Sequence, residues 1–311
     1  MRHPPDPSPD ALPGAPATRP EVRRLEHRLG DAARAVLPPW AAELVMFVLK
    51  QGWACLFGGL LLGALLVTDA LWSDAWALRR YDALLLLAVA LQAAFLRWGL
   101  ETWEEARVIL LFHLTGTAME LFKVGAGSWA YPEPALLKLW GVPLFSGFMY
   151  ASVGSYMARA IRIFDMTFAP CPPFWTTVAL AGAIYVNFFA HHVLPDLRWV
   201  LFAATLLLFG GTRAWFRVDR GWRWMPLPLA AALSSLALWV AENIGTMTGT
   251  WLYSGQMRGE WVGLSKLGSW YLLLYVAFVT VTLVSRRALS RLPVAPPGPE
   301  GAGLERGAAA P

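Results

Sequence analysis

The amino-acid sequence contains a succession of apolar stretches, each close to the length with which an α-helix crosses a lipid bilayer. Such a helix needs about 20 mostly apolar residues. The 311 residues are 57% hydrophobic and 15% charged, whereas an average soluble domain has about 25% charged residues. The sequence therefore predicts an all-α, polytopic membrane helix bundle. About eight transmembrane helices are expected, at residues 52–72, 82–99, 106–124, 142–163, 174–192, 197–216, 226–247 and 267–285.

The segments outside these stretches have a different composition. Residues 1–20 are rich in proline, residues 292–311 in proline, glycine and alanine, and both are predicted to be disordered tails. Residues 21–50 are predicted to form an amphipathic interfacial helix, because Leu25 and Leu29 recur on one face and Arg24 and Arg28 on the other. A solvated helix packed on the bundle is the alternative. Residues 52–285 form the predicted transmembrane bundle.

The distribution of basic residues predicts the orientation. Lys and Arg are concentrated in the segments that lie on the same side as the two termini, including the loop with Arg213, Arg217, Arg220 and Arg223. Because basic loops stay in the cytoplasm, both termini are expected there, in a multi-pass protein of the cell inner membrane. The net charge of +5 is explained by this asymmetry and does not indicate nucleic-acid binding.

A pattern of four residue types occurs twice, with a constant separation of 122 residues. It consists of Glu120, Gly127, Trp129 and Tyr131, and again of Glu242, Gly249, Trp251 and Tyr253. The pattern predicts a parallel internal repeat, with units at about 106–163 and 226–285. The pseudo-axis relating parallel repeats runs along the membrane normal, so both glutamates are expected at equal depth.

Glu120 and Glu242 are the candidate catalytic residues, because a carboxyl group late in an apolar segment is costly. A neutral carboxylic acid can donate a proton to a substrate, and two of them can divide acid and base roles. The alternative is structural, with Glu120 held by Lys123 and Glu242 by Asn243 or a backbone group.

Further site residues are predicted from their positions relative to these glutamates. His113 lies two helical turns before Glu120 on the same face and is a third catalytic candidate, as a proton relay. The alternative is a histidine bonded to a backbone carbonyl. The candidate substrate-binding residues are Trp129, Tyr131, Trp251, Tyr253 and Asn243. Rings of this kind stabilise a carbocation through their negative faces, although interfacial anchoring also explains them.

Other polar groups favour structural roles. Five histidines and two cysteines without ligand spacing do not predict a metal site, so none is expected. His191 and His192 are interpreted as interfacial residues. Glu101, Glu104 and Glu105 are interpreted as a solvated face. No cofactor is implied, and the expected partners are the bilayer and an apolar lipid substrate.

Three motifs resemble a bacterial membrane family, the domain-of-unknown-function family 817. They are residues 113–123, 127–133 and 141–150, and the resemblance extends over about 45–285. It implies a multi-span inner-membrane protein. A shorter stretch, with Glu120, Gly127, Trp129, Tyr131 and residues 141–144, is similar to membrane carotenoid hydratases and lycopene cyclases. The adjacent paired carboxylates that those cyclases carry at a span are missing from the predicted spans of this chain.

Two functions are consistent with these observations. The first is an intramembrane acid–base enzyme that hydrates or isomerises an isoprenoid-type lipid. The second is a proton-coupled transporter or carrier that uses the same two glutamates.

Overall fold

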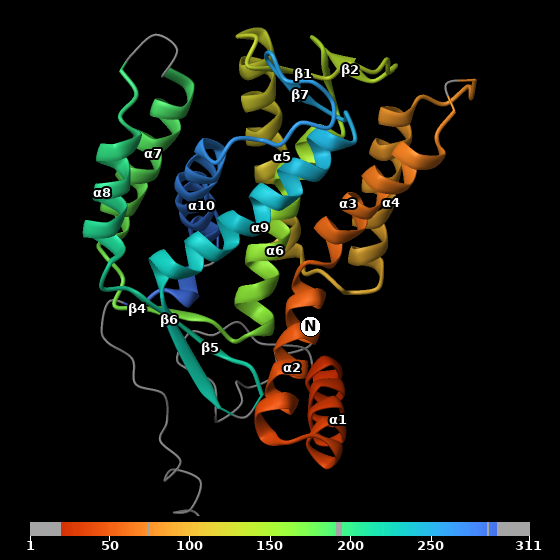
Figure 1. The fold of residues 1–311 in the computed structure, drawn as a ribbon. Helices are drawn as coiled ribbons and strands as arrows, with labels where there is room; N and C mark the ends of the chain where they lie inside the picture. The colour runs from red at the N-terminus through yellow and green to blue at the C-terminus, as the bar shows by residue number, and fades with distance from the viewer. Residues whose placement is uncertain (1–19, 74, 191–194, 220, 285, 291–311) are drawn as a thin grey trace, which may run out of the picture.

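The computed structural model describes residues 20–73, 75–190, 195–219, 221–284 and 286–290. The two predicted tails lie outside these residues except for Pro20. The described part is mostly helical (Figure 1). Its α-helices are α1 (Pro20–Val36), α2 (Pro39–Ala54), α3 (Leu56–Leu71), α4 (Arg80–Arg97), α5 (Trp103–Gly125), α6 (Ser146–Ile163), α7 (Phe174–Ala190), α8 (Arg198–Phe209), α9 (Leu227–Met247) and α10 (Ser265–Val284), followed by the short 3-10 helix η1 (Arg286–Ala288).

Each of the helices α3 to α10 overlaps one of the eight apolar stretches. Among the described residues, α5, α9 and α10 are long and apolar enough to cross a membrane. The pair α2 and α3 adds a fourth candidate if it is counted as one span bent by 70°. The helices α7 and α8 are apolar but have only 17 and 12 residues.

The segment expected to be one interfacial helix is divided into two helices. The chain leaves α1 at Val36, and Pro39 begins α2, where a proline without an N–H fits the first helical turn. The two helices pack against each other (Figure 1). Arg34 of α1 forms an ion pair with Asp219 in the loop after β5.

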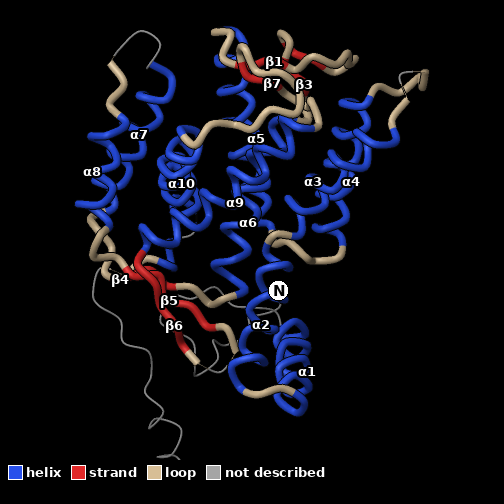
Figure 2. The backbone as a smooth tube through the Cα atoms, viewed as in Figure 1, coloured by secondary structure: helices blue, strands red, loops and turns tan. Residues whose placement is uncertain are grey.

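Short strands lie at both ends of the helices (Figure 2). At one end, β1 (Trp129–Ala130) pairs with β7 (Leu252–Tyr253), and β2 (Lys138–Leu139) pairs with β3 (Val142–Pro143). At the other end, β4 (Thr167–Ala169), β5 (Arg213–Arg217) and β6 (Trp222–Pro226) form an antiparallel sheet. The predicted stretch 197–216 is therefore helical only as far as Phe209, and the basic loop is largely a β-hairpin.

The interpretation of the acidic loop before α5 as a solvated face is wrong for two of its three glutamates. Glu101 is fully buried and bonds Arg159 at 3.0 Å, while Glu105 bonds Arg162 at 2.7 Å. Both arginines belong to α6. Glu104 is exposed. The four charges are buried as pairs because an unpaired buried charge is far more costly.

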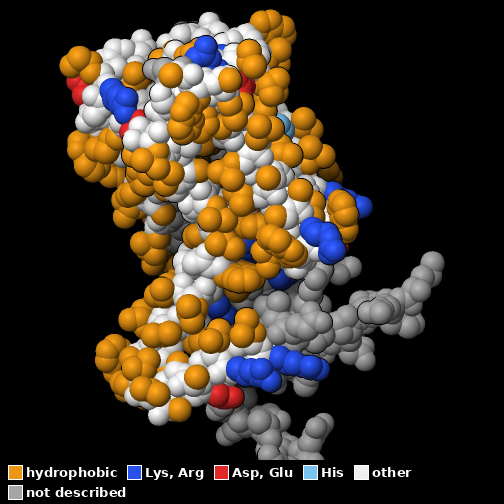
Figure 3. Space-filling view, turned by 90° about the vertical axis from the view of Figure 1, so that its right-hand side faces the viewer, with side chains coloured by type: hydrophobic (Ala, Val, Ile, Leu, Met, Phe, Trp, Pro, Cys, Tyr) orange, Lys and Arg blue, Asp and Glu red, His pale blue; other side chains and the backbone are white. Residues whose placement is uncertain are grey.

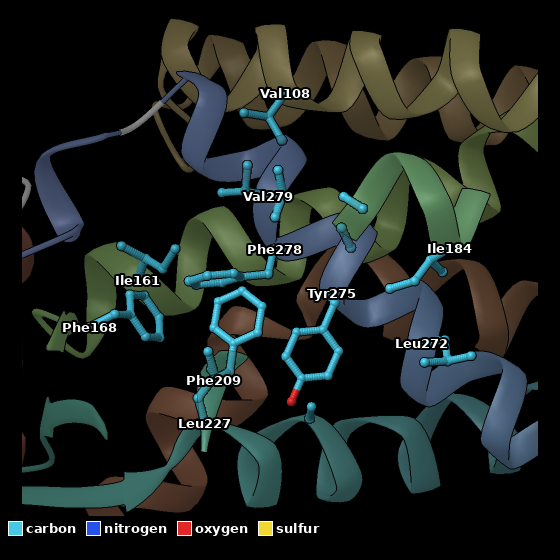
Figure 4. Packing of buried hydrophobic residues seen from close by; sticks show 14 of the residues in the cluster. Val108, Ile161, Phe168, Ile184, Phe209, Leu227, Leu272, Tyr275, Phe278 and Val279 are labelled. Atoms are coloured by element: carbon cyan, nitrogen blue, oxygen red, sulfur yellow. The ribbon is translucent and has the colours of Figure 1, made fainter. Parts of the chain in front are cut away.

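The largest buried apolar cluster lies where α6, α8 and α10 approach the three-stranded sheet (Figure 4). The ring of Phe209 stacks on Tyr275 with centroids 5.0 Å apart. Phe278 meets Phe168 and Phe209 edge-on, at 4.8 and 6.0 Å. Hydrophobic side chains also cover most of the outer face seen in Figure 3.

Candidate functional site: two glutamates on one cavity

The helices α5 and α9 end in the same backbone turn. Gly127 and Gly249 follow them with φ of +69° and +65°, a conformation that favours glycine. The N–H of Ser128 donates to the carbonyl of Lys123 at 2.9 Å. The N–H of Thr250 donates to the carbonyl of Gly245 at 3.0 Å. This is the Schellman arrangement of a helix C-terminus.

The strands after these turns pair with each other. Ala130 of β1 faces Leu252 of β7, and these two residues are 122 positions apart. Trp129 faces Tyr253 in the same pair, with ring centroids 5.7 Å apart and the rings edge-on. Because corresponding residues face each other, the two turns are related locally by an approximate two-fold axis.

Each turn directs its tryptophan back to the glutamate of the preceding helix. The indole Nε1 of Trp129 donates to Oε2 of Glu120 at 2.7 Å. In the second turn, Nε1 of Trp251 donates to Oε1 of Glu242 at 2.8 Å. The Trp251 ring passes directly over Gly245, where a Cβ atom would lie 1.8 Å from it. The glycine therefore makes room for the ring that holds the carboxylate.

Tyrosine hydroxyls supply additional donors. Tyr150 of α6 donates to Oε1 of Glu120 at 2.6 Å, and Tyr253 donates to Oε1 of Glu242 at 2.7 Å. Tyr131 also interacts with Glu120. Burial raises the pKa of Tyr131 and Tyr253 well above its usual range, so these hydroxyls keep their protons. Both glutamates are buried, and their carboxylates are held as hydrogen-bond acceptors.

Both glutamates line the same cavity, which has a volume of about 950 Å³. The volume lies near the upper end of the ~300–1,000 Å³ typical of ligand pockets. The four predicted rings, Trp129, Tyr131, Trp251 and Tyr253, line it as well. The remaining wall comes mainly from α3, α6, α9 and α10 and is largely apolar, and it extends to Phe216 and Met225 in the three-stranded sheet.

Basic side chains line the end of the cavity where the glutamates lie. Lys123 of α5 is almost completely buried, and its ammonium lies 4.3 Å from the centroid of the Phe188 ring. Lys266 of α10 lies 3.8 Å from the centroid of Tyr253. Arg198, at the start of α8, is the third cation on this wall.

Two predicted site residues do not line the cavity. His113 lies between α5 and α6, where it packs against Gly147 and the ring of Phe148 at 4.5 Å. The amide of Asn243 is bonded to the backbone, because Nδ2 donates to the carbonyl of Trp239 at 2.7 Å and Oδ1 accepts from the N–H of Val262 at 2.8 Å. Asn243 thus anchors the loop before α10. His191 and His192 lie outside the described residues.

Tyr150, Lys266 and Trp270 were not among the predicted site residues, although all three line the cavity. Trp270 interacts with Glu242. The sequence contains a signal for Tyr150, since a tyrosine, Tyr271, also occurs 121 residues later. It contains no such signal for Lys266. Within the described part of the chain, no group of three His, Cys, Asp or Glu side chains is arranged to hold a metal ion.

The fold and the site define a helical protein in which two glutamates, each on a helix that ends in the same kind of turn, line one long, largely apolar cavity, and the described residues include three helices apolar enough to span a membrane. The chain belongs to the family described as "Protein of unknown function (DUF817)", which matches residues 43–278. It is 43% identical over 241 residues to the "Uncharacterized protein YoaT" of Bacillus subtilis (strain 168), covering 77% of this chain and 90% of that protein. No solved structure is significantly similar to it.

Proposed function

We propose that the protein is an intramembrane acid–base enzyme that hydrates or isomerises a carbon–carbon double bond of an isoprenoid-type lipid. The observation that carries this proposal is the presence of two buried glutamates on one long, largely apolar cavity. An apolar cavity of this size suits a hydrocarbon chain, and the paired carboxyl groups supply the proton transfers that the chemistry needs.

The reaction begins when one glutamate, in its protonated form, donates its proton to an alkene carbon. The resulting carbocation lies beside the edge-on rings of Trp129 and Tyr253, whose π-electrons stabilise positive charge. In an isomerisation, the other glutamate, as carboxylate, removes a proton from a neighbouring carbon, so that no atom is gained or lost. In a hydration, water adds to the cation and the same carboxylate takes the excess proton.

The openings of the cavity support entry of substrate from the bilayer. Gly59 on α3 and Cys55 directly before this helix line the cavity and are exposed on the protein surface, as are Leu233 and Ala237 on α9. A substrate dissolved among lipid chains therefore reaches the cavity sideways, between α3 and α9. The proposal includes about eight spans in the cell inner membrane and both termini in the cytoplasm.

We also propose that α5–α6 and α9–α10 are units of a parallel internal repeat. The matching turns and the pairing of Ala130 with Leu252 support it. The local two-fold axis between the turns is consistent with a pseudo-axis along the membrane normal.

The test is the lipid content of cells that contain the wild-type protein, Glu120→Gln, Glu242→Gln or no protein. We expect one isoprenoid species to change with the wild type and to return to the deletion level in both variants. Glu104→Gln is the matched control, because Glu104 is exposed and does not line the cavity. Identical isoprenoid profiles in wild-type and deletion cells would refute the enzyme.

Entry from the bilayer has a separate test at α3. Gly59→Trp places an indole at the opening, and we expect it to abolish the change in the isoprenoid species that the wild-type protein causes. Gly63→Trp is the control, since Gly63 lies on the same helix, also has free space around it and does not line the cavity. Equal activity of the two variants would exclude this entrance.

A proton-coupled carrier is the second candidate, and one observation favours it. The cavity extends from Phe216 and Met225 near one end of the helices to Trp129 and Tyr253 near the other. A carrier predicts pH-dependent solute flux in reconstituted vesicles that is lost in Glu120→Gln or Glu242→Gln. Absence of proton-coupled flux for all tested solutes, together with a changed lipid, would reject the carrier.

A further inference from the structure

The cluster of cations at the glutamate end of the cavity is not used by the proposed proton transfers. Lys123, Lys266 and Arg198 come from three separate helices, α5, α10 and α8, and all line this end. Lys123 is 1% exposed. A lysine is rarely buried to this extent without partners, and although Lys123 interacts with its protein surroundings, three cations from three helices at one end of a large cavity require a reason.

The electrostatic surroundings make that reason more specific. Lys123 and Lys266 are close enough to repel each other, and Lys266 and Arg198 are as well. The acids that face this group are Glu242, which attracts Lys266, and Asp196, which bonds Arg198 at 2.7 Å. Glu120 is held by Trp129 and Tyr150. Two lysines that repel each other at one end of a cavity are stabilised by an anion placed between them.

The rest of the cavity determines what carries the anion. From the lysines the cavity continues along Leu238 and Leu272 to Phe278, so the same space has one end with three cations beside the two glutamates and a long, largely apolar remainder. We infer that it binds an amphipathic lipid whose anionic head group, of phosphate type, lies between Lys123 and Lys266 with its hydrocarbon chain along α6, α9 and α10.

This inference deepens the proposed function, because it names the substrate class and places the first double bonds of the chain nearest to Glu120 and Glu242. A phosphate accepts several charge-assisted hydrogen bonds from ammonium groups. The head group therefore sets the depth of the chain, and the glutamates act on the carbons next to it.

The experiment measures binding, which does not depend on catalysis. Purified protein in detergent is titrated with geranylgeranyl phosphate, geranylgeraniol and inorganic phosphate, and binding is followed by tryptophan fluorescence and by the thermal midpoint. We expect geranylgeranyl phosphate to bind at least about tenfold more tightly than the alcohol. The difference should disappear in Lys123→Met and in Lys266→Met.

Lys50→Met is the matched control, because Lys50 is also buried but donates to the carbonyl of Arg217 and does not line the cavity. If Lys123→Met does not fold, the test depends on Lys266→Met, which is expected to fold because Lys266 is only partly buried. Equal affinity for phosphate and alcohol, or a preference that survives both variants, overturns the inference. Inorganic phosphate that binds as tightly as the lipid shows a free-anion site and also overturns it.

The test of the head-group site can be distinguished from the test of the proposed enzymatic activity. Glu120→Gln and Glu242→Gln are expected to keep the preference for the phosphate while losing the lipid change. Loss of the preference in the lysine variants with an unchanged lipid profile would support the head-group site and reject the enzyme. A wild-type protein that changes the isoprenoid profile but shows no preference for geranylgeranyl phosphate would support the enzyme and reject the head-group site.

Discussion

The turn after α5 and the turn after α9 have the same backbone but hold their glutamates differently. Glu120 receives one hydrogen bond on each carboxylate oxygen, from Trp129 and from Tyr150 on another helix. Glu242 receives the bonds of Trp251 and Tyr253, both from its own turn, on the single oxygen Oε1, and it also interacts with Trp270 of α10.

The position three residues after each glutamate explains part of this difference. It is Lys123 in the first turn and Gly245 in the second. Gly245 leaves space for the Trp251 ring, whereas Lys123 directs a cation toward the ring of Phe188. A repeated backbone thus supports one carboxylate that accepts a bond on each oxygen and another that accepts both bonds on one oxygen. Two acids that are held differently can take different roles in one reaction.

The largest effect on stability is expected when a side chain at Gly245 fills the space that the Trp251 ring occupies. In Gly245→Ala, the new Cβ would lie 1.8 Å from the Trp251 ring, so the ring or the helix must move. We expect a loss of about 3 kcal/mol in the free energy of unfolding, the upper end of the range for overpacking. Denaturation in mixed detergent micelles measures it. Gly125→Ala at the end of α5 is the control, with nothing within 4 Å, and equal stability of the two variants would refute the packing argument.

The second effect concerns the indole donors. Trp129→Phe and Trp251→Phe each remove an N–H bonded to a carboxylate, which costs about 2 kcal/mol. We expect Trp251→Phe to cost more, because the smaller ring also leaves a space above Gly245. The same denaturation measurement tests this order. A larger loss for Trp129→Phe would show that Gly245 and Trp251 do not depend on each other.

Some of these features could be predicted from the sequence and others could not. The helices α3 to α10 overlap the eight predicted stretches because these stretches are apolar, although α8 ends at Phe209 and residues 213–216 belong to a strand. The repeated pattern predicted equal depth for Glu120 and Glu242, which lie near the ends of α5 and α9; that both line one cavity depends on how these helices pack, which the pattern does not give. The ion pairs of Glu101 and Glu105 were missed because their partners on α6 are more than 50 residues away in the chain.

Contacts between distant segments also explain the errors within the site. Tyr150 reaches Glu120 only because α6 packs against α5. His113 shares a helix face with Glu120, but Gly147 allows α6 to lie against it and separates it from the cavity. Asn243 is next to Glu242 in the chain, yet its side chain is bonded to the backbone of another loop. A helical period gives the direction of a side chain but not the element that it meets.

The third effect tests the two ways of holding a carboxylate. In Glu242→Gln, the amide oxygen can accept both bonds that Oε1 accepts. In Glu120→Gln, the amide NH₂ must replace one accepting oxygen; because Trp129 cannot accept a bond, the NH₂ faces Tyr150, whose hydroxyl then accepts and loses its own acceptor. We expect Glu242→Gln to be the more stable variant by about 1 kcal/mol. Equal stability, measured in the same micelles, would mean that the two arrangements are equivalent.

The smallest effect is expected at the two glycines of the turns themselves. Gly127→Ala and Gly249→Ala force a Cβ into the left-handed region, which costs about 1 kcal/mol. Around Gly127 the added Cβ meets nothing within 4 Å, whereas at Gly249 it would lie 3.2 Å from Cδ of Arg258. Arg258 is an exposed side chain bonded to Asp69 of α3 and can move aside at little cost. Gly249→Ala is therefore expected to be only slightly less stable than Gly127→Ala.

The control is Gly63→Ala, which has an ordinary helical conformation with free space around it and should show no loss of stability. A loss in only one of the two turn variants would mean that the backbones of the two turns differ in solution.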